Sequence, residues 1–240
     1  MKTRFFKITL LVFLLCIISC NRNTSNNQIA DFEEKMFIDE IVERIEFNPI
    51  NNIHTMVIPD GVTYIGDAQF HSKNIYNVII PNTVNTIDDF AFMGNFLENI
   101  LLPNNLREIG AGAFGSNRLK NIVIPDSVVL LGPAAFANNN LTEVIISKNI
   151  TTIWSNVFEN NFLEKIIIPN NVVQIHDGAF YNNRITEIKL GGNIEFNVTS
   201  FRNNIFGEFD EKFRHYYYLN NKIGGLYRFN ENLQEWEFIQ

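Results

Sequence analysis

Cysteine is nearly absent from this chain of 240 residues, which contains only Cys16 and Cys20. A disulfide framework or a cysteine-based zinc site is therefore excluded for everything after Cys20. Long apolar runs are missing as well. The longest unbroken one, Leu10–Ile18, spans nine residues, whereas a membrane-spanning helix needs roughly 20.

Sequence motifs of catalysis are also missing. The chain has no G-x-S-x-G, P-loop or H-E-x-x-H pattern. Residues 110–115 do fit G-x-G-x-x-G, but Gly110-Ala111-Gly112 lies in a turn of the repeated unit, so we interpret it as no phosphate cradle. Its four histidines show no metal-binding spacing: His54, His71, His176 and His215. His176 stands beside Asp177, but at a turn position of a repeated unit, so we interpret the pair as a surface turn rather than a catalytic dyad. The sequence predicts no enzyme, no metal, no cofactor and no small-molecule substrate.

Basic charge is scarce, with 19 Lys and Arg against 26 Asp and Glu. If residues 1–19 are removed, as argued next, 16 basic residues face 26 acidic ones, and the net charge is −10. An acidic surface repels phosphate backbones, so we expect no nucleic-acid partner.

The N-terminus has the pattern of an export signal, with basic residues before the apolar run Leu10–Ile18. The run ends in Ile17-Ile18-Ser19-Cys20, which resembles a bacterial lipobox. That resemblance implies cleavage before Cys20 and acylation of Cys20, and two or more acyl chains give stable membrane anchoring. Asn21, rather than Asp, follows the cysteine and favours export to the outer membrane or cell surface. An ordinary secretory signal with a chance cysteine is the alternative. We predict a signal peptide over 1–19 and a polar tether over 20–28.

A 22-residue unit repeats through most of the remaining chain. Proline recurs at this interval, with one serine in its place: Pro59, Pro81, Pro103, Pro125, Ser147 and Pro169. Phenylalanine recurs likewise, with a seventh copy one residue early: Phe70, Phe92, Phe114, Phe136, Phe158, Phe180 and Phe201. We expect these rings to form a structural ladder inside a stack of seven units over 49–205.

Aliphatic residues fill five further columns of the unit. Around Pro125 they are Leu119, Ile122, Ile124, Val128 and Leu131. Branched residues favour strands and proline ends them, so each unit predicts a strand, a second short extended piece and a tight turn before the Phe. No unit holds a helical pattern of ten residues, which excludes helical repeats.

An Asn column follows three residues after the Phe: Asn95, Asn117, Asn139, Asn161, Asn183 and Asn204, with Lys73 in the first unit. Asn tolerates left-handed backbone and bonds nearby main chain. We interpret the column as a structural turn ladder rather than a glycan or metal site.

A second informative column stands two residues before the proline: Val57, Ile79, Leu101, Val123, Ile145 and Ile167, followed by Lys189. Strand alternation places it on the outer face, opposite the core. Mostly charged residues lie near it: Tyr76, Glu98, Lys120, Glu143, Glu164 and Glu187. We consider two interpretations, a contact surface for a protein partner or a second copy, and a solvent-facing ladder that only raises strand propensity.

The units resemble BspA-like leucine-rich repeats, whose pattern is matched by Leu119-Lys120-Asn121-Ile122-Val123-Ile124-Pro125, Val128, Leu131 and Ala135-Phe136. The resemblance implies a mainly β leucine-rich-repeat solenoid and a bacterial surface protein that binds proteins. It also implies adhesion to host matrix proteins such as fibronectin and fibrinogen, or to other cells, without catalytic residues. A self-associating structural or assembly lipoprotein of the envelope is the alternative.

Both ends of such a stack need covering, because exposed strand edges aggregate. An apolar stripe predicts an N-terminal capping helix over 29–48: Ile29, Phe32, Met36, Ile41 and Ile45. A membrane-surface or partner helix is the alternative there. At the other end, 216–219, 226–229 and 235–239 read as three strands of a β cap over 206–240. A small carbohydrate-binding module would show similar paired aromatics.

Overall fold

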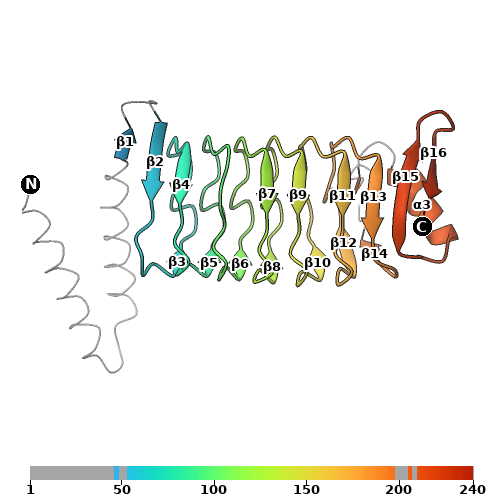
Figure 1. Ribbon diagram of the computed structural model, residues 1–240, viewed down its shortest axis with the longest axis horizontal. Coiled ribbons are helices and arrows are strands. Elements are labelled where there is room, and N and C mark those ends of the chain that lie inside the picture. Colours follow the sequence, from blue (N-terminus) through green and yellow to red (C-terminus); the bar gives the residue numbers. More distant parts are fainter. Residues whose placement is uncertain (1–45, 49–52, 198–204, 207–209, 240) are drawn as a thin grey trace, which may run out of the picture. The chain divides into compact units, whose positions relative to one another are not determined.

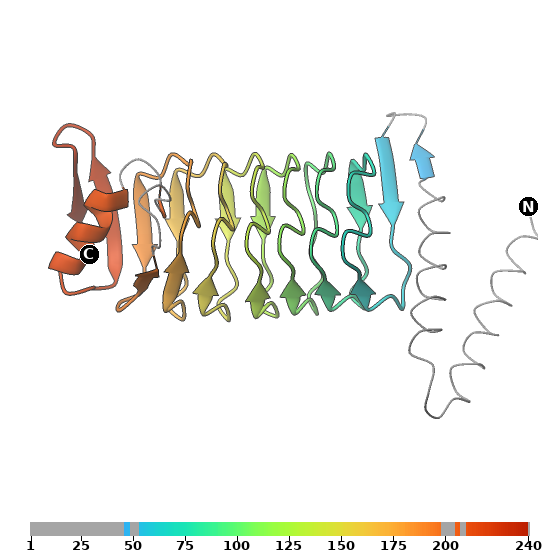
Figure 2. The ribbon, with the colours of Figure 1, turned by 180° about the vertical axis from the view of Figure 1, so that it is seen from behind.

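The computed structural model describes residues 46–48, 53–197, 205–206 and 210–239. The repeats form a mainly β solenoid in which successive coils follow one another in chain order (Figure 1). Each coil presents two short extended segments, and these align with their neighbours into two rows of parallel strands. Figure 2 shows the same rows from behind.

The first row follows the L-x-x-I-x-I-P segments of the sequence. Its strands are β2 (Ile53–Val57), β4 (Asn77–Ile79), β7 (Asn121–Val123), β9 (Glu143–Ile145), β11 (Lys165–Ile167) and β13 (Glu187–Leu190). Their register follows the repeat, since Met56 pairs with Val78 and Ile166 with Ile188. Residues 99–101 occupy the same place in the third coil without strand geometry.

The second row follows the proline. Its strands are β3 (Tyr64–Ile65), β5 (Thr86–Ile87), β6 (Glu108–Ile109), β8 (Leu130–Leu131), β10 (Thr152–Ile153), β12 (Gln174–His176) and β14 (Glu195–Asn197). The aliphatic columns point inward from both rows and are buried, Leu119, Val128 and Leu131 among them. One coil therefore closes its interior only against its neighbours, as expected for a solenoid.

Phenylalanine rings form a continuous stack through this interior. Neighbouring rings from Phe70 to Phe180 lie 5.3–5.9 Å apart with interplanar angles of 6–22°. Each Phe N–H from Phe70 to Phe158 also donates to a carbonyl of the next coil, as Phe136 does to Val157 at 2.9 Å. Stacking and backbone bonding thus repeat together at every coil.

The last ring that the structure describes in this stack is Phe206, whereas the sequence predicted Phe201 there. Phe206 stacks on Phe180 at 5.7 Å, and the Phe180 N–H donates to the carbonyl of Ile205. The expected one-residue deletion is present before β14, where Ile175 pairs with Phe196. A five-residue insertion then follows: Phe206 comes ten residues after Phe196, whereas Phe180 comes five residues after Ile175, the partner of Phe196. Phe201 and Asn204 lie outside the described residues. The solenoid has about six turns rather than the expected seven.

Antiparallel strands cover the ends of the first row. β1 (Glu46–Asn48) pairs with β2 at one end, and the hairpin of β15 (Gly225–Asn230) and β16 (Glu235–Phe238) pairs with β13 at the other. The N-terminal helix expected over 29–48 is wrong at its last three residues, which form β1. Its remaining residues, the signal peptide and the tether lie outside the described residues.

The single helix among the described residues is α3 (Asp210–Leu219), at the C-terminal end. The strand expected at 216–219 is therefore wrong, while those at 226–229 and 235–239 match β15 and β16. The buried residues of α3 are Asp210, Phe213 and Tyr217, which are spaced along one helical face.

The Asp210 carboxylate accepts hydrogen bonds from Phe206 N–H and from Arg214, and burial raises the pKa of Asp210. Within the described residues, no helix is long and apolar enough to cross a bilayer.

The ring stack makes a testable prediction. Phe136 is fully buried between Phe114 and Phe158, so Phe136→Ala should lower the free energy of unfolding by about 3–5 kcal/mol. Phe162→Ala is the control, because that ring is 43% exposed, and it should cost less than about 1 kcal/mol. Chemical denaturation measures both; equal costs would contradict the assigned role of the stack.

Candidate functional site

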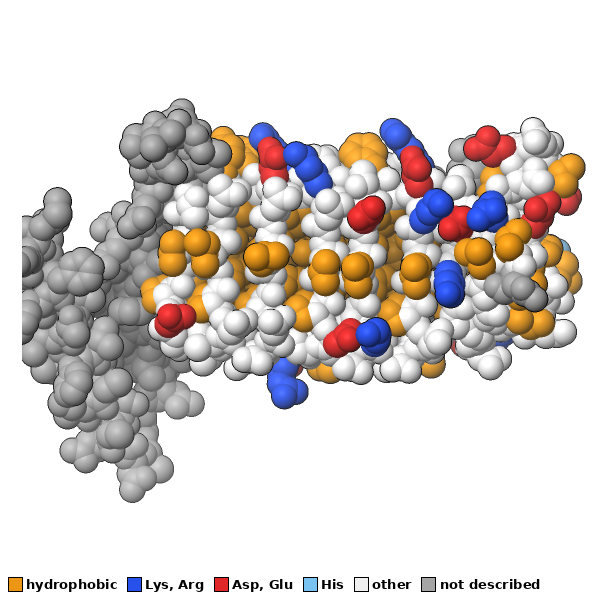
Figure 3. All heavy atoms as spheres, viewed as in Figure 1, with side chains coloured by type: hydrophobic (Ala, Val, Ile, Leu, Met, Phe, Trp, Pro, Cys, Tyr) orange, Lys and Arg blue, Asp and Glu red, His pale blue; other side chains and the backbone are white. Residues whose placement is uncertain are grey.

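The outward column of the first strand row forms a continuous exposed apolar stripe. Its six members are Val57, Ile79, Leu101, Val123, Ile145 and Ile167, with exposed fractions between 47% and 88%. Figure 3 shows hydrophobic side chains in a row across this face. Each lies between two inward positions of its extended segment, so the alternation that buries its neighbours exposes it. At about 4.8 Å per coil, five spacings make the stripe about 24 Å long.

Polar side chains border the stripe. On one side they are mostly amides and charges two residues before each member: Thr55, Asn77, Asn99, Asn121, Glu143 and Lys165. Glu187 takes the same place before Lys189. Exposed Lys189 ends the stripe at β13. The face thus has an apolar centre and a polar edge, the arrangement that typifies protein interfaces.

The charges nearby are partly neutralised. Lys120 pairs with Glu98 at 2.8 Å, and Arg228 with Glu187 at 2.8 Å. Because of these partners, the pKa values of Glu98 and Glu187 are lowered. The edge of the stripe is therefore of mixed charge rather than predominantly acidic.

The Asn column lies inside the coils and is committed to the main chain. Asn139 accepts from Leu119 N–H at 3.0 Å and donates to the carbonyls of Phe114 and Phe136 at 2.9 and 3.1 Å. Equivalent bonds form at Asn95, Asn117, Asn161 and Asn183. These amides, buried except for the half-buried Asn183, join adjacent coils and have little capacity left for a ligand.

Left-handed backbone occurs one residue before this column, not within it. Asn138, Asn160 and Asn182 have φ values of 53–56°. Their side chains form a second ladder, in which Asn160 donates to Asn138 and Asn182 to Asn160, both at 2.7 Å. The two properties that favour Asn in this turn are thus divided between adjacent residues.

The remaining polar clusters show no metal or catalytic arrangement within the described part of the chain. No group of three His, Cys, Asp or Glu residues could hold a metal ion there. The His176 ring stacks on Trp154 with centroids 4.7 Å apart, and Nε2 lies 3.5 Å from Asn197 Nδ2.

Sequence reasoning missed a polar groove at the turn between the two strand rows. The groove has a volume of about 640 Å³, and its lining includes Asp60, Asn85, Arg107 and Ser127 from successive coils. We call it the corner groove. The repeat gave one usable signal, because serine at 127 replaces the asparagine found at 105, 149 and 171.

Comparison with protein families gives the assignment. The family described as the BspA type leucine rich repeat region, with six copies, matches residues 19–96, 40–161 and 85–210. This chain belongs to the BspA-type leucine-rich repeat family. The outward apolar stripe and the inward Phe and Asn columns are thus features of a BspA-type solenoid.

Two solved structures are reported as similar to this chain. A leucine-rich repeat protein from Bacteroides ovatus has a TM-score of 0.58 and 24% identity, over 66% of this chain and 42% of its own. A leucine rich cell surface protein from Faecalibacterium prausnitzii has a TM-score of 0.45 and 18% identity, over 81% of this chain and 58% of its own. The chain thus spans about half the length of these proteins, and the first supports the fold alone. No curated protein matches significantly.

Proposed function

We propose that this chain is a non-enzymatic binding protein that contacts a protein partner through the apolar stripe. The exposure of six stacked aliphatic residues carries this proposal. Monomeric proteins seldom expose contiguous apolar patches beyond a few hundred Å². A full interface buries about 800 Å² per partner, and one row of side chains about 24 Å long covers less area than that. A partner would therefore also contact the amide-rich edge.

The partner class that we favour is an extracellular protein. The signal-like N-terminus and the lipobox-like sequence ending in Cys20 support export and lipid anchoring at the cell surface. From there the BspA-type solenoid would mediate adhesion to host matrix proteins or other cells. The acidic balance of the chain favours partners with neutral or basic surfaces.

Self-association is the second candidate, and the stripe itself favours it. A surface of this kind can face its own copy across a two-fold axis, which would cover both apolar faces. Antiparallel strands cover the edges of the first row at β2 and β13. A second copy would therefore contact the stripe rather than a strand edge. This reading would make the chain a structural or assembly lipoprotein of the envelope.

The stripe can be tested with a triple substitution, Leu101→Thr, Val123→Thr and Ile145→Thr. Threonine is β-branched and suits a strand, so the fold should persist while apolar contact is reduced. Binding to immobilised fibronectin or fibrinogen should weaken at least about tenfold. The control replaces exposed Leu130, Val173 and Leu233 by Thr and should retain binding.

Light scattering on the same proteins separates the two candidates. A dimer that the triple substitution dissociates, without binding to either matrix protein, would favour self-association. Unchanged binding and unchanged oligomeric state in the triple variant would mean that the stripe is only structural.

Anchoring has its own test. Mass spectrometry of the exported protein should find a chain that begins at Cys20 and carries acyl groups, and Cys20→Ser should release the protein from the membrane fraction. An unmodified N-terminus created by cleavage elsewhere would refute the lipid anchor.

A further inference from the structure

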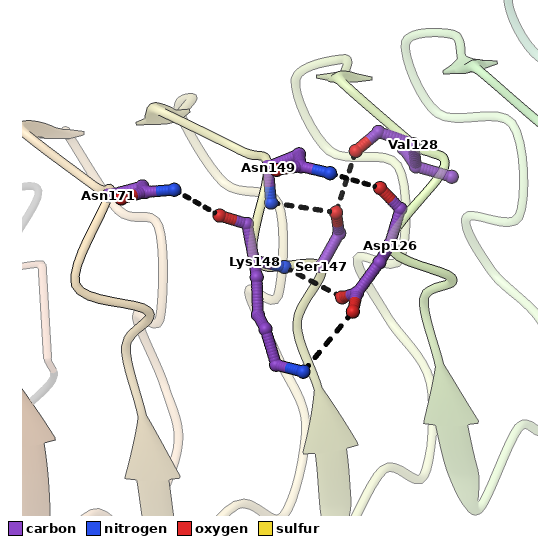
Figure 4. A network of polar contacts seen from close by, with 6 residues as sticks. All are labelled: Asp126, Val128, Ser147, Lys148, Asn149 and Asn171. Atoms are coloured by element: carbon purple, nitrogen blue, oxygen red, sulfur yellow. Dashed lines mark hydrogen bonds and ion pairs between the residues drawn. The ribbon is translucent and has the colours of Figure 1, made fainter.

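The corner groove differs from the same turn farther along the solenoid. Figure 4 shows that turn in later coils, where polar side chains bond to the coil beside them. Lys148 Nζ lies 3.2 Å from Asp126, while Asn149 and Asn171 donate to the carbonyls of Asp126 and Lys148 at 2.6 and 2.8 Å. These side chains stabilise the fold, and their bonds to the neighbouring coil leave few polar groups free for a ligand.

Ser127 interrupts this pattern inside the groove. At its position in three other coils, an asparagine Nδ2 reaches the preceding coil, as Asn105 reaches the carbonyl of Asn82 at 3.0 Å. In the second coil the hydroxyl of Thr83 donates to the carbonyl of Val62 at 2.8 Å. Serine is too short for the equivalent bond to Asn104. Its hydroxyl is buried and is the one buried side-chain polar atom without a hydrogen-bond partner in the described part of the chain. A water or a ligand in the groove can satisfy such an atom.

Arg107 supplies an unpaired cation to the groove. Its exposed guanidinium forms no hydrogen bond or ion pair with the described residues, unlike Lys148 in the later coils. Asn85 accepts from Thr86 through Oδ1, which leaves its Nδ2 protons available. Asn82 likewise uses its Oδ1 to accept from Asn104 N–H. The unused groups are thus mainly donors, with the Asp60 carboxylate as an acceptor at one end.

We propose that the corner groove binds an acidic sugar, a glycan unit that bears a carboxylate. The Arg107 fork matches a carboxylate in bidentate geometry. The Asn82 and Asn85 amides and the Ser127 hydroxyl suit sugar oxygens, and Asp60 accepts from sugar hydroxyls. A simple anion would use only Arg107, and a neutral sugar would leave Arg107 unpaired.

The size of the groove agrees with such a ligand. From Asp60 to Ser127 the lining extends over three coil spacings, about 14 Å at 4.8 Å each, which suits a short oligosaccharide rather than one small ion. The volume of about 640 Å³ falls in the usual range for small-molecule sites. The groove involves different side chains from those of the apolar stripe, so it does not rest on the proposed protein partner.

Calorimetric titration of the full chain with a trimer of galacturonic acid tests the proposal. We expect saturable binding that Arg107→Gln weakens at least tenfold, while Lys73→Gln, which removes an exposed cation outside the groove, leaves it unchanged. Equal affinity for the neutral galactose trimer would overturn the proposal. So would competition by acetate alone at the same concentration, or full binding by Arg107→Gln.

Ser127→Asn is a second variant, in which loss of folding is not expected. The added amide should reach the Asn104 carbonyl, as Asn105, Asn149 and Asn171 reach the coil before them, and occupy the Ser127 end of the groove. The melting temperature should stay the same or rise, while binding of the galacturonic acid trimer is lost. Undiminished binding by a folded Ser127→Asn protein would place the ligand elsewhere.

Discussion

The structure depends on one constraint: buried main-chain groups of each coil must be bonded by the next coil. The Asn column satisfies it most directly, since Asn139 bonds Leu119 N–H in the preceding coil and carbonyls in both coils. An unpaired buried polar group costs about 1–3 kcal/mol. Adding or removing a residue within a coil would displace this amide, which accounts for the constant 22-residue length through the central coils.

The same constraint decides where function can lie. Inward columns are occupied by apolar packing, and the Asn column by main-chain bonds, so their regularity reports folding only. The outward stripe from Val57 to Ile167 and the turn that holds Arg107 are less restricted by the neighbouring coils. The two proposals therefore concern side chains that the solenoid does not need for closure: an apolar face for a protein and a donor-rich groove for an acidic sugar.

Periodicity explains how much could be predicted from sequence. The two strand rows, the buried columns and the exposure of Leu101 or Val123 follow from the 22-residue interval and from strand alternation. Prediction failed where the interval ends. Phe201 kept nearly the right spacing, but Phe206 follows an insertion and fills the ring position, because burial rather than spacing selects the residue.

Prediction of the C-terminal cap and of the groove failed for other reasons. Consecutive tyrosines at 216–218 suggested a strand, whereas Asp210, Phe213 and Tyr217 follow helical spacing and bury one helix face. The groove is lined by side chains from four coils, with the short Ser127 at one end and with Arg107, whose side chain has no partner among the described residues. A single sequence shows the substitution but not the empty volume between coils.

Hydrogen exchange at the Leu119 amide is the most direct test of the inter-coil constraint. This N–H donates to Asn139 Oδ1, whereas Phe114 N–H donates to the backbone carbonyl of Ala135. If Asn139 bonds the coils as described, both amides should exchange equally slowly, through the same cooperative opening. Exchange at Leu119 that is much faster than at Phe114 would contradict the account.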